Sequence, residues 1–423
     1  MLSRLKGVSK DPFLRQNAIF FAGSMVVAVV NYAYHPMVSR FLSVRDFGEV
    51  VTLLSLSAQF GVVIGIFGTV ATNIRVRGER IVAGRSMLLE LQSFAVILAG
   101  VASCLLLAGT PYLTRVLSFH STSPFLVLSA ILLVSVSYNF ASSGLQGARR
   151  FGELSIASFI MAIGRLLFGI LFVVLGWNTL GAVAGIFIAQ LVALFYILRI
   201  HTDDAGTDVF VRPHFDTLFL AELKYGLLVF AGTGFITLLY TADVIAVKYF
   251  FDPTIAGMYG GIETIARIIF FATGSIAGVL FPSLSQSHTS QENLRNFRKA
   301  VILTLVVTCS GLFVLWFFPK LVIGLMLGER YLPLANLLPK LALVVSLTSL
   351  LNIFMIYFLA LRKVQLLFLG MTGTVLLALS IGVKHETVQD IVNDFLIVNS
   401  LSLVLFLWVF WRDVVRSRNE VHP

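Results

Sequence analysis

Long apolar runs, separated by short polar segments, repeat along the whole chain. The run from Ala300 to Phe318 is typical, because it contains no charged residue and is nearly long enough to cross a bilayer. A crossing needs about 20 mostly apolar residues, since the hydrocarbon core is about 30 Å thick. Backbone groups inside that core must be hydrogen-bonded within the segment, so each run is expected to be a helix.

Twelve such runs are predicted to span the membrane. Their approximate bounds are residues 17–38, 47–70, 87–109, 124–144, 155–175, 180–198, 222–247, 255–280, 300–318, 335–360, 364–383 and 391–411. The composition agrees, with 58% hydrophobic residues, 12% charged residues and a mean hydropathy of +0.93. A soluble domain carries about 25% charged residues. The predicted fold class is therefore an all-α polytopic membrane protein of about 12 transmembrane helices, and the first run is expected to be a retained span rather than a signal peptide.

The Lys and Arg residues indicate the orientation. With the N-terminus inside, 21 of the 31 fall on the inner segments and 8 on the outer ones, while Arg165 and Arg267 lie within spans. This bias follows the positive-inside rule and predicts that both termini are cytoplasmic. Topology thus accounts for the net charge of +10, and nucleic acid is not an expected partner.

An internal repeat divides the twelve spans into two sets of six. The stretch Val38–Val50 matches Val247–Tyr259 at an offset of 209, so that Gly48 falls on Gly257. A second match, at an offset of 213, relates later parts of the halves. Six spans is an even number, so both halves have the same orientation and are expected to be related by an axis along the membrane normal.

The longest polar connector lies near the middle of the chain, which places the domain boundaries. We predict an N-terminal six-helix bundle at 1–200, a cytoplasmic linker at 201–216 and a C-terminal six-helix bundle at 217–423. Two pseudo-symmetric bundles can rock against one another, so that a cleft opens to either side in turn. This organisation favours a transporter.

Four charged residues within spans are candidate substrate-binding residues, since charge at mid-bilayer costs about 2.5–3.5 kcal/mol on insertion scales. Arg165 lies near the middle of the fifth span and Arg267 in the eighth. Glu263 precedes Arg267 by four residues and is predicted to share its helix face, and Asp243 lies in the outer part of the seventh span. Arginine suits an anionic substrate because its planar fork donates two hydrogen bonds to phosphate. A structural ion pair, or snorkelling to an interface, explains the same residues without a substrate.

A polar stripe on the first span adds two candidates. Asn17, Ser24, Asn31 and His35 follow one another at spacings of 7, 7 and 4 residues, which places them along one side of a helix. Such a stripe is expected to face a cavity or a partner helix rather than lipid. Asn31 and His35 are therefore candidate substrate-binding residues, and His35 is a candidate carrier of a coupling proton. Hydrogen bonding between helices is the more frequent reason for such a stripe.

Other kinds of site have little support in the sequence. The motifs of nucleotide-binding loops, zinc proteases and serine hydrolases do not occur. Cys104 and Cys309 fall deep in spans, where small packing residues are expected. The loop histidines His120, His201 and His288 have no metal partners at ligand spacing. We therefore expect no enzyme, no metal site and no cofactor.

Three motifs recur in the order seen in one family. The segment HPMVSRFLSVRDFGEV (His35–Val50) resembles the first-loop pattern of oligosaccharide flippases, in which an R-x-L turn precedes D-[YF]-G. Asp243–Phe271 is similar to the second-half pattern, and LQGARRF (Leu145–Phe151) is similar to the loop between the fourth and fifth spans. The whole chain thus resembles the O-antigen (Wzx-type) polysaccharide-transport branch of the multidrug/oligosaccharidyl-lipid/polysaccharide exporter superfamily.

The resemblance implies a flippase of the cytoplasmic membrane, for cell-surface polysaccharide and lipopolysaccharide biosynthesis. It implies that alternating access moves an undecaprenyl-diphosphate-linked oligosaccharide from the inner to the outer leaflet. Arg165 and Arg267 would then hold diphosphate or acidic sugars. The family leaves open whether H+ or Na+ is the coupling ion, and polysaccharide-assembly membrane proteins are implied partners. The alternative is an ion-coupled multidrug or cation exporter of the same superfamily.

Overall fold

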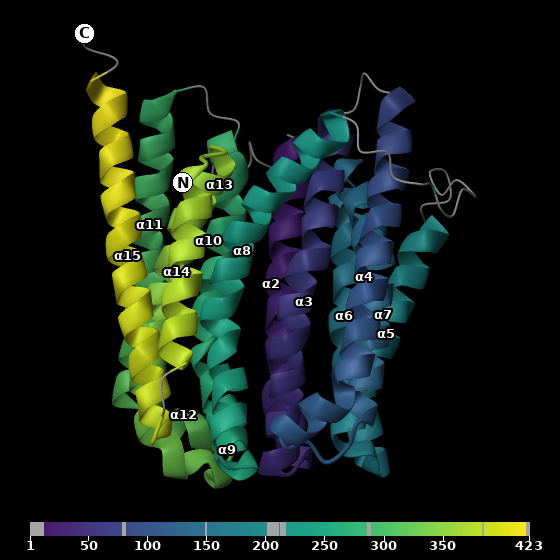
Figure 1. Ribbon diagram of the computed structural model, residues 1–423, viewed down its shortest axis with the longest axis vertical. Helices are drawn as coiled ribbons and strands as arrows, with labels where there is room; N and C mark the ends of the chain where they lie inside the picture. Colours follow the sequence, from purple (N-terminus) through teal and green to yellow (C-terminus); the bar gives the residue numbers. More distant parts are fainter. Residues whose placement is uncertain are drawn as a thin grey trace. The chain divides into compact units, whose positions relative to one another are not determined.

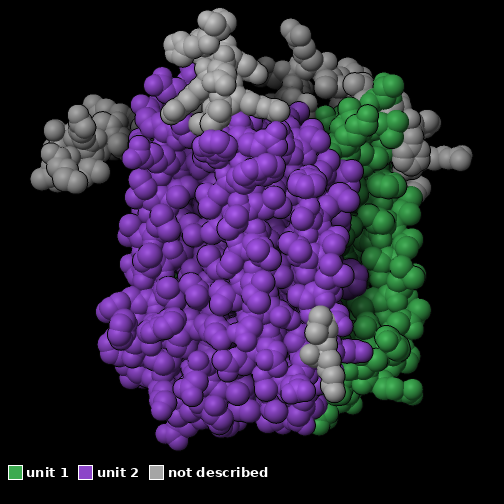
Figure 2. All heavy atoms as spheres, turned by 60° about the vertical axis from the view of Figure 1, so that its left-hand side comes forward, with its two compact units in different colours: residues 1–46, 63–226 green, residues 47–62, 227–423 purple. Residues whose placement is uncertain are grey.

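The computed structural model describes residues 12–77, 82–148, 150–200, 211, 217–285, 289–382 and 385–419. Nearly all of this part of the chain is helical, and it contains no strand. The chain forms two compact units, which are coloured separately in Figure 2. Unit 1 comprises residues 1–46 and 63–226, and unit 2 comprises residues 47–62 and 227–423.

Unit 1 contains the first six long helices or parts of them (Figure 1). They are α2 (Pro12–Phe41), α3 (Val44–Arg77), α4 (Val82–Val116), α5 (Ser123–Gly147), α6 (Phe151–Phe172) and α7 (Asn178–Ile200), with a π-helical turn, η1 (Val173–Trp177), before α7. Helix α3 contributes residues 44–46 and 63–77 to this unit. Helix α6 packs against α7 and α2, and α7 also packs against α5.

Small residues allow α6 and α7 to pack at short range. A Cβ atom on Gly185 of α7 would lie 2.3 Å from the backbone nitrogen of Gly169 on α6. Close backbone approach at small residues is a common way of joining helices in membranes. The chain reverses between the two helices at Gly176, whose φ of +90° suits glycine, and at Asn178, whose φ is +45°.

Unit 2 contains residues 47–62 of α3 and, except for residues 217–226, which belong to unit 1, the remaining helices. They are α8 (Thr217–Phe250), α9 (Pro253–Ala266), α10 (Ile268–Ser285), α11 (Ser290–Phe317), α12 (Pro319–Met326), the 3-10 helix η2 (Glu329–Leu337), α13 (Leu338–Ala360), α14 (Gln365–Ile381) and α15 (Val388–Asn419). Helix α13 is the most buried span and contacts α9, α10, α11, α14 and α15. It therefore forms the core of this unit.

The starts of several helices follow from local hydrogen bonding. Before α3, the Ser43 hydroxyl accepts from the Asp46 N–H at 3.0 Å and donates to the Asp46 carboxylate at 2.7 Å. Before α11, the Thr289 hydroxyl accepts from the Glu292 N–H at 3.2 Å. Both pairs have the spacing of a capping box, which satisfies backbone donors at a helix N-terminus.

The glycines that the repeat aligns lie against one another within unit 2. A Cβ atom on Gly48 of α3 would lie 2.5 Å from the Cα of Gly257 on α9 and 3.0 Å from its nitrogen. A contact this short leaves no room for a side chain at Gly48. The two helices thus cross at backbone contact.

All twelve predicted spans coincide with helices. Within the described residues, nine segments are long and apolar enough to cross a membrane, one of which, Phe151–Ile200, holds both α6 and α7. Helix α14 is a shorter apolar helix at the eleventh predicted run, and α2 covers the first. Large apolar side chains such as Leu105 and Leu379 are 68% and 67% exposed, as expected of helix faces that meet lipid.

Two short helices were not expected from the sequence, and the predicted domain boundaries are not tested. Helices α12 and η2 were not predicted, and they occupy the connection around Gly328, whose φ is +93°. The predicted boundaries at 200 and 217 stay a prediction. The predicted linker 201–216 lies outside the described residues except for Val211, whose N–H donates to the Ser93 hydroxyl at 3.0 Å.

Candidate functional site

Unit 2 contains a buried ionic cluster that joins three of the predicted site residues. The Arg267 guanidinium donates to the Glu263 carboxylate through Nε, and its Nη2 lies 3.8 Å from Asp243 Oδ1. The Tyr259 hydroxyl donates to Asp243 Oδ2 at 2.7 Å. Asp243, Tyr259, Glu263 and Arg267 are each at most 7% exposed. We name these four residues the ionic cluster.

Two helices position the ionic cluster. Helix α9 begins at Pro253, and the Asp252 carboxylate caps it by accepting from the Thr254 N–H at 2.8 Å. From this start, Tyr259 and Glu263 follow on α9 and Arg267 is its C-cap residue; the intervals of four residues place the three along one side of the helix. The pair predicted from the spacing of Glu263 and Arg267 is present, and α8 adds the carboxylate of Asp243.

The charges of the ionic cluster do not balance, because two carboxylates face one guanidinium. Asp243 Oδ1 and Glu263 Oε2 are buried and have no hydrogen-bond partner among the described residues. Buried charges need partners, since removing one from water costs several kcal/mol. Arg267 also lies 5.6 Å from the ring centre of Tyr240. The ionic cluster therefore contains one more carboxylate than guanidinium, and Arg267 is already paired with these carboxylates.

Arg165 has a different environment in unit 1. Its Cζ lies 4.0 Å above the ring centre of Tyr34 on α2, a cation–π contact. Tyr34 is fully buried, and its hydroxyl donates to the Ala182 carbonyl at 3.1 Å. The Arg165 Nε is buried without a hydrogen-bond partner, and none of the described carboxylates forms an ion pair with this residue. In the part of the chain that the structure describes, Arg165 is thus a cation within a membrane span without a neighbouring anion.

The first-span candidates lie beside this contact. His35 makes an edge-on ring contact with Tyr34 at 5.6 Å, and Asn31, three residues before Tyr34 on α2, is half-buried. The structure thus brings Arg165 and His35 to the same aromatic ring. The side chains of Asn17 and Ser24 lie outside the described residues.

Sequence reasoning missed Tyr34 and gave no role to Tyr259. Tyr259 had one signal, since it belongs to the segment that resembles the family's second-half pattern. Tyr34 had only its position between Asn31 and His35, because an aromatic residue in a span is usually a packing residue. Its pairing with Arg165 joins positions that are far apart in the sequence and could not be read from local spacing.

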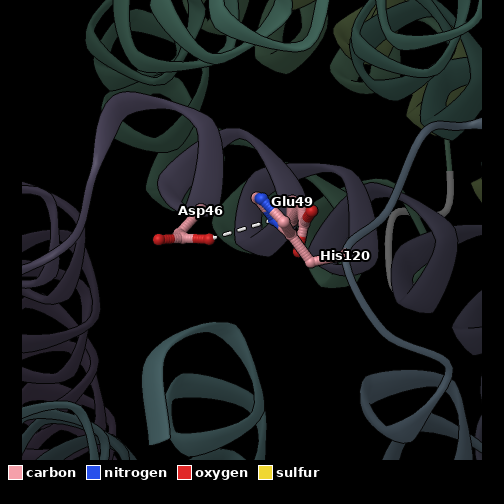
Figure 3. A group of neighbouring side chains, drawn as sticks. All are labelled: Asp46, Glu49 and His120. Carbon is pink, nitrogen blue, oxygen red and sulfur yellow. Dashed lines mark ion pairs between the residues drawn. The ribbon is translucent and has the colours of Figure 1, made fainter. Parts of the chain in front are cut away.

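A third group of polar residues gathers at the start of α3 (Figure 3). His120, on the loop after α4, has its Nδ1 3.4 Å from Asp46 Oδ1, and Glu49 lies one turn further along α3. One ligand atom from each of the three lies within 4.8 Å of the others. The structure thus brings two carboxylates to His120 that the sequence spacing did not indicate, and the expectation of no metal site stays a prediction. The contacts of Asp46 with Ser43 and His120 explain the group as a helix cap that holds a loop. His201 and His288 lie outside the described residues.

Comparisons with known proteins decide the family. The family described as "Polysaccharide biosynthesis protein" matches residues 13–288, which is more than half of the chain. The chain belongs to this family. The recognition made from the three sequence motifs is thereby confirmed. No curated protein matches the sequence.

Solved structures share the fold of this chain. A multidrug resistance MATE family transporter of the MOP superfamily, in an inward-facing conformation, has a TM-score of 0.73 at 13% identity, covering 95% of this chain and 99% of its own. The lipid II flippase MurJ, in an inward closed conformation, has a TM-score of 0.72 at 12% identity, covering 93% and 87%. The same fold therefore serves both exporters and a lipid flippase, and the predicted fold class is confirmed.

Proposed function

We propose that this protein is a flippase for an undecaprenyl-diphosphate-linked oligosaccharide. It moves the substrate from the inner to the outer leaflet by alternating access, for cell-surface polysaccharide biosynthesis of the O-antigen or lipopolysaccharide kind. The family match and the fold shared with a lipid II flippase support this proposal. Polysaccharide-assembly membrane proteins would then take up the product in the outer leaflet.

The environment of Arg165 carries the proposal. An arginine in a span needs an anion to offset its loss of hydration, and the neighbour that the described residues supply is the neutral side chain of Tyr34. A diphosphate offers several oxygens to the guanidinium fork, which donates up to five hydrogen bonds. Asn31 and His35, on either side of Tyr34, would contact the same headgroup.

The distribution of Lys and Arg supports the location. The protein is proposed to lie in the cytoplasmic membrane with both termini in the cytoplasm, because 21 of its 31 basic residues fall on the segments that this orientation places inside. Substrate made on the cytoplasmic leaflet would then enter from the side where the basic loops lie.

The ionic cluster is the proposed site of the coupling ion, either H+ or Na+. Its two carboxylates exceed its one guanidinium, so a proton or a sodium ion would complete the balance of charge. Hard cations such as sodium take oxygen ligands, which Asp243, Glu263 and Tyr259 provide. Arg267 then acts by holding the carboxylates in place rather than as a free cation for diphosphate.

Export of glycan in cells tests the proposal. The variant Arg165→Gln, in a strain that lacks the native gene, should lower surface glycan about 10–100-fold, because hydrogen bonds to a charged group contribute about 1.5–3 kcal/mol. Arg165→Lys keeps the charge and should retain part of the export. Arg115→Gln, an exposed arginine at the end of α4, is the matched control. Unchanged export by Arg165→Gln at normal protein level would refute the role of Arg165.

A second function, ion-coupled export of cationic drugs, is favoured by one observation. The ionic cluster has an excess of carboxylates, which would attract a cationic substrate as well as a coupling ion. Efflux of cationic dyes by the purified protein, together with normal surface glycan after gene deletion, would support this function instead.

A further inference from the structure

A hollow of about 270 Å³ lies in unit 1 between α2, α5 and α6, close to the α5–α6 turn. Five of its seven lining residues carry an uncharged polar group: Tyr138, Ser142 and Gln146 from α5, and Ser155 and Ser158 from α6. The two remaining lining residues are apolar. No lining residue is charged, and the polar groups of the hollow are set among apolar surface.

The hydroxyl groups of this hollow are not all used by the protein itself. The Ser155 hydroxyl is buried and has no hydrogen-bond partner among the described residues. The Ser142 hydroxyl is likewise buried without a hydrogen-bond partner among the described residues. A buried hydroxyl without a partner is unfavourable, so a ligand that offers hydroxyl groups would be stabilised here.

The hollow lies on the same side of α6 as Arg165. Ser158 and Arg165 are seven residues apart, which is about two turns and about 10 Å along the helix. Helix α2 follows this side of α6, since a Cβ on Gly23 would lie 3.0 Å from Ser155 and a Cβ on Gly169 would lie 2.8 Å from Tyr34. A diphosphate at Arg165 would therefore place its first sugars beside the hollow.

We propose that the hollow binds an uncharged, hydroxyl-bearing sugar of the lipid-linked glycan. The inference rests on the proposed function and adds the class of sugar to it. Serine, tyrosine and glutamine side chains both donate and accept hydrogen bonds, as sugar hydroxyls do. A uronic acid would bring a carboxylate that finds no cation in the lining, and a buried charge without a partner is strongly unfavourable. The hollow thus selects neutral sugars and rejects acidic ones.

Direct binding to the purified full-length protein tests this class assignment. The probes are farnesyl diphosphate, farnesyl diphosphate glucose and farnesyl diphosphate glucuronic acid, radiolabelled and measured by equilibrium dialysis. The two sugar probes differ only at C6, where glucose has a hydroxymethyl group and glucuronic acid a carboxylate. The glucose probe should bind about tenfold more tightly than the probe without sugar, because each added hydrogen bond contributes about threefold to tenfold. The glucuronic acid probe should show no such gain.

The double variant Ser155→Ala/Ser158→Ala should lose the extra affinity for the glucose probe and bind the sugar-free probe as the wild type does. Binding of the sugar-free probe also reports correct folding. Should the double variant bind no probe, each serine variant alone is measured in the same way, and at least one should lose the gain while binding the sugar-free probe. Ser137→Ala, on α5 and outside the lining, is the matched control and should behave as the wild type.

Each adverse result has a different meaning. Equal binding of all three probes, unaffected by the alanine variants, would overturn the inference but leave the proposed function standing. Tighter binding of glucuronic acid than of glucose would overturn the neutral class. A wild-type protein that binds no probe, the sugar-free diphosphate included, would overturn the proposed function and this inference with it.

Discussion

Replacing Gly48 by alanine tests the helix crossing that joins α3 to α9 in unit 2. The new Cβ would lie 2.5 Å from the Gly257 Cα and 3.0 Å from its nitrogen. Both neighbours are backbone atoms, which cannot rotate away as a side chain would. The helices must therefore separate locally, and their other contacts at the crossing weaken.

The size of the effect follows from two opposing terms. Overpacking of a well-packed contact costs about 1–3 kcal/mol, whereas alanine in place of glycine favours a helix by about 0.5–1 kcal/mol. Gly61 lies on the same helix, is exposed, and has no atom within 4 Å of its added Cβ. Gly61→Ala should therefore show only the favourable helix term. The difference in unfolding free energy between the two variants gives the cost of overpacking at the crossing, about 1–3 kcal/mol.

The assay is thermal unfolding of purified protein in detergent, followed by loss of the monodisperse peak on size-exclusion chromatography. One kcal/mol shifts the midpoint by about 2–4 °C in units of this size, so Gly48→Ala should unfold several degrees below Gly61→Ala. The heating rate must be the same for both, since unfolding of such proteins is often irreversible. Equal midpoints for the two variants would refute the backbone contact between Gly48 and Gly257.

Further predictions concern the ionic cluster and one helix cap. Arg267→Gln should lower the amount of folded protein in the membrane sharply, because the loss of one partner of a buried ion pair costs about 3–5 kcal/mol. Adding Glu263→Gln should restore much of that amount. The membrane yield of each variant measures both effects, and additive losses in the double variant would contradict the pairing. Tyr259→Phe removes the hydrogen bond to Asp243 and should weaken the dependence of transport on an ion gradient while leaving protein yield within about twofold, as expected for one hydrogen bond of about 1 kcal/mol. Thr289→Ala removes the cap of α11 and should lower the thermal unfolding midpoint of the protein by an amount that corresponds to about 1 kcal/mol. An unchanged midpoint would argue against the cap.

The fold could be predicted from the sequence because a membrane restricts the possible structures. Each apolar run of sufficient length must form a helix, and the bias of Lys and Arg orders the loops. The connection with α12 and η2 escaped prediction, since short irregular helices depend on local packing around positions such as Gly328 rather than on hydropathy. The internal repeat aligned Gly48 with Gly257, but the sequence alone does not show that aligned residues are in contact.

The candidate site could be predicted only in part. Charge within a span identified Arg165, Glu263, Arg267 and Asp243, because such residues are costly wherever they lie. The sequence could pair Glu263 with Arg267 through helix periodicity. Contacts between different helices, such as Tyr34 with Arg165, depend on tertiary packing and have no local signal. The structure also changes the expectation for Arg267, which is paired and therefore better suited to hold carboxylates than to bind diphosphate.

The most direct test of the account is a flipping assay with purified protein. The protein is reconstituted into liposomes that contain an undecaprenyl-diphosphate oligosaccharide, and a membrane-impermeant probe reports the sugar that reaches the far leaflet. The account predicts protein-dependent translocation that falls about 10–100-fold in Arg165→Gln, in keeping with the loss of charged hydrogen bonds. An absence of translocation for several glycans, under both proton and sodium gradients, would contradict it and favour the exporter.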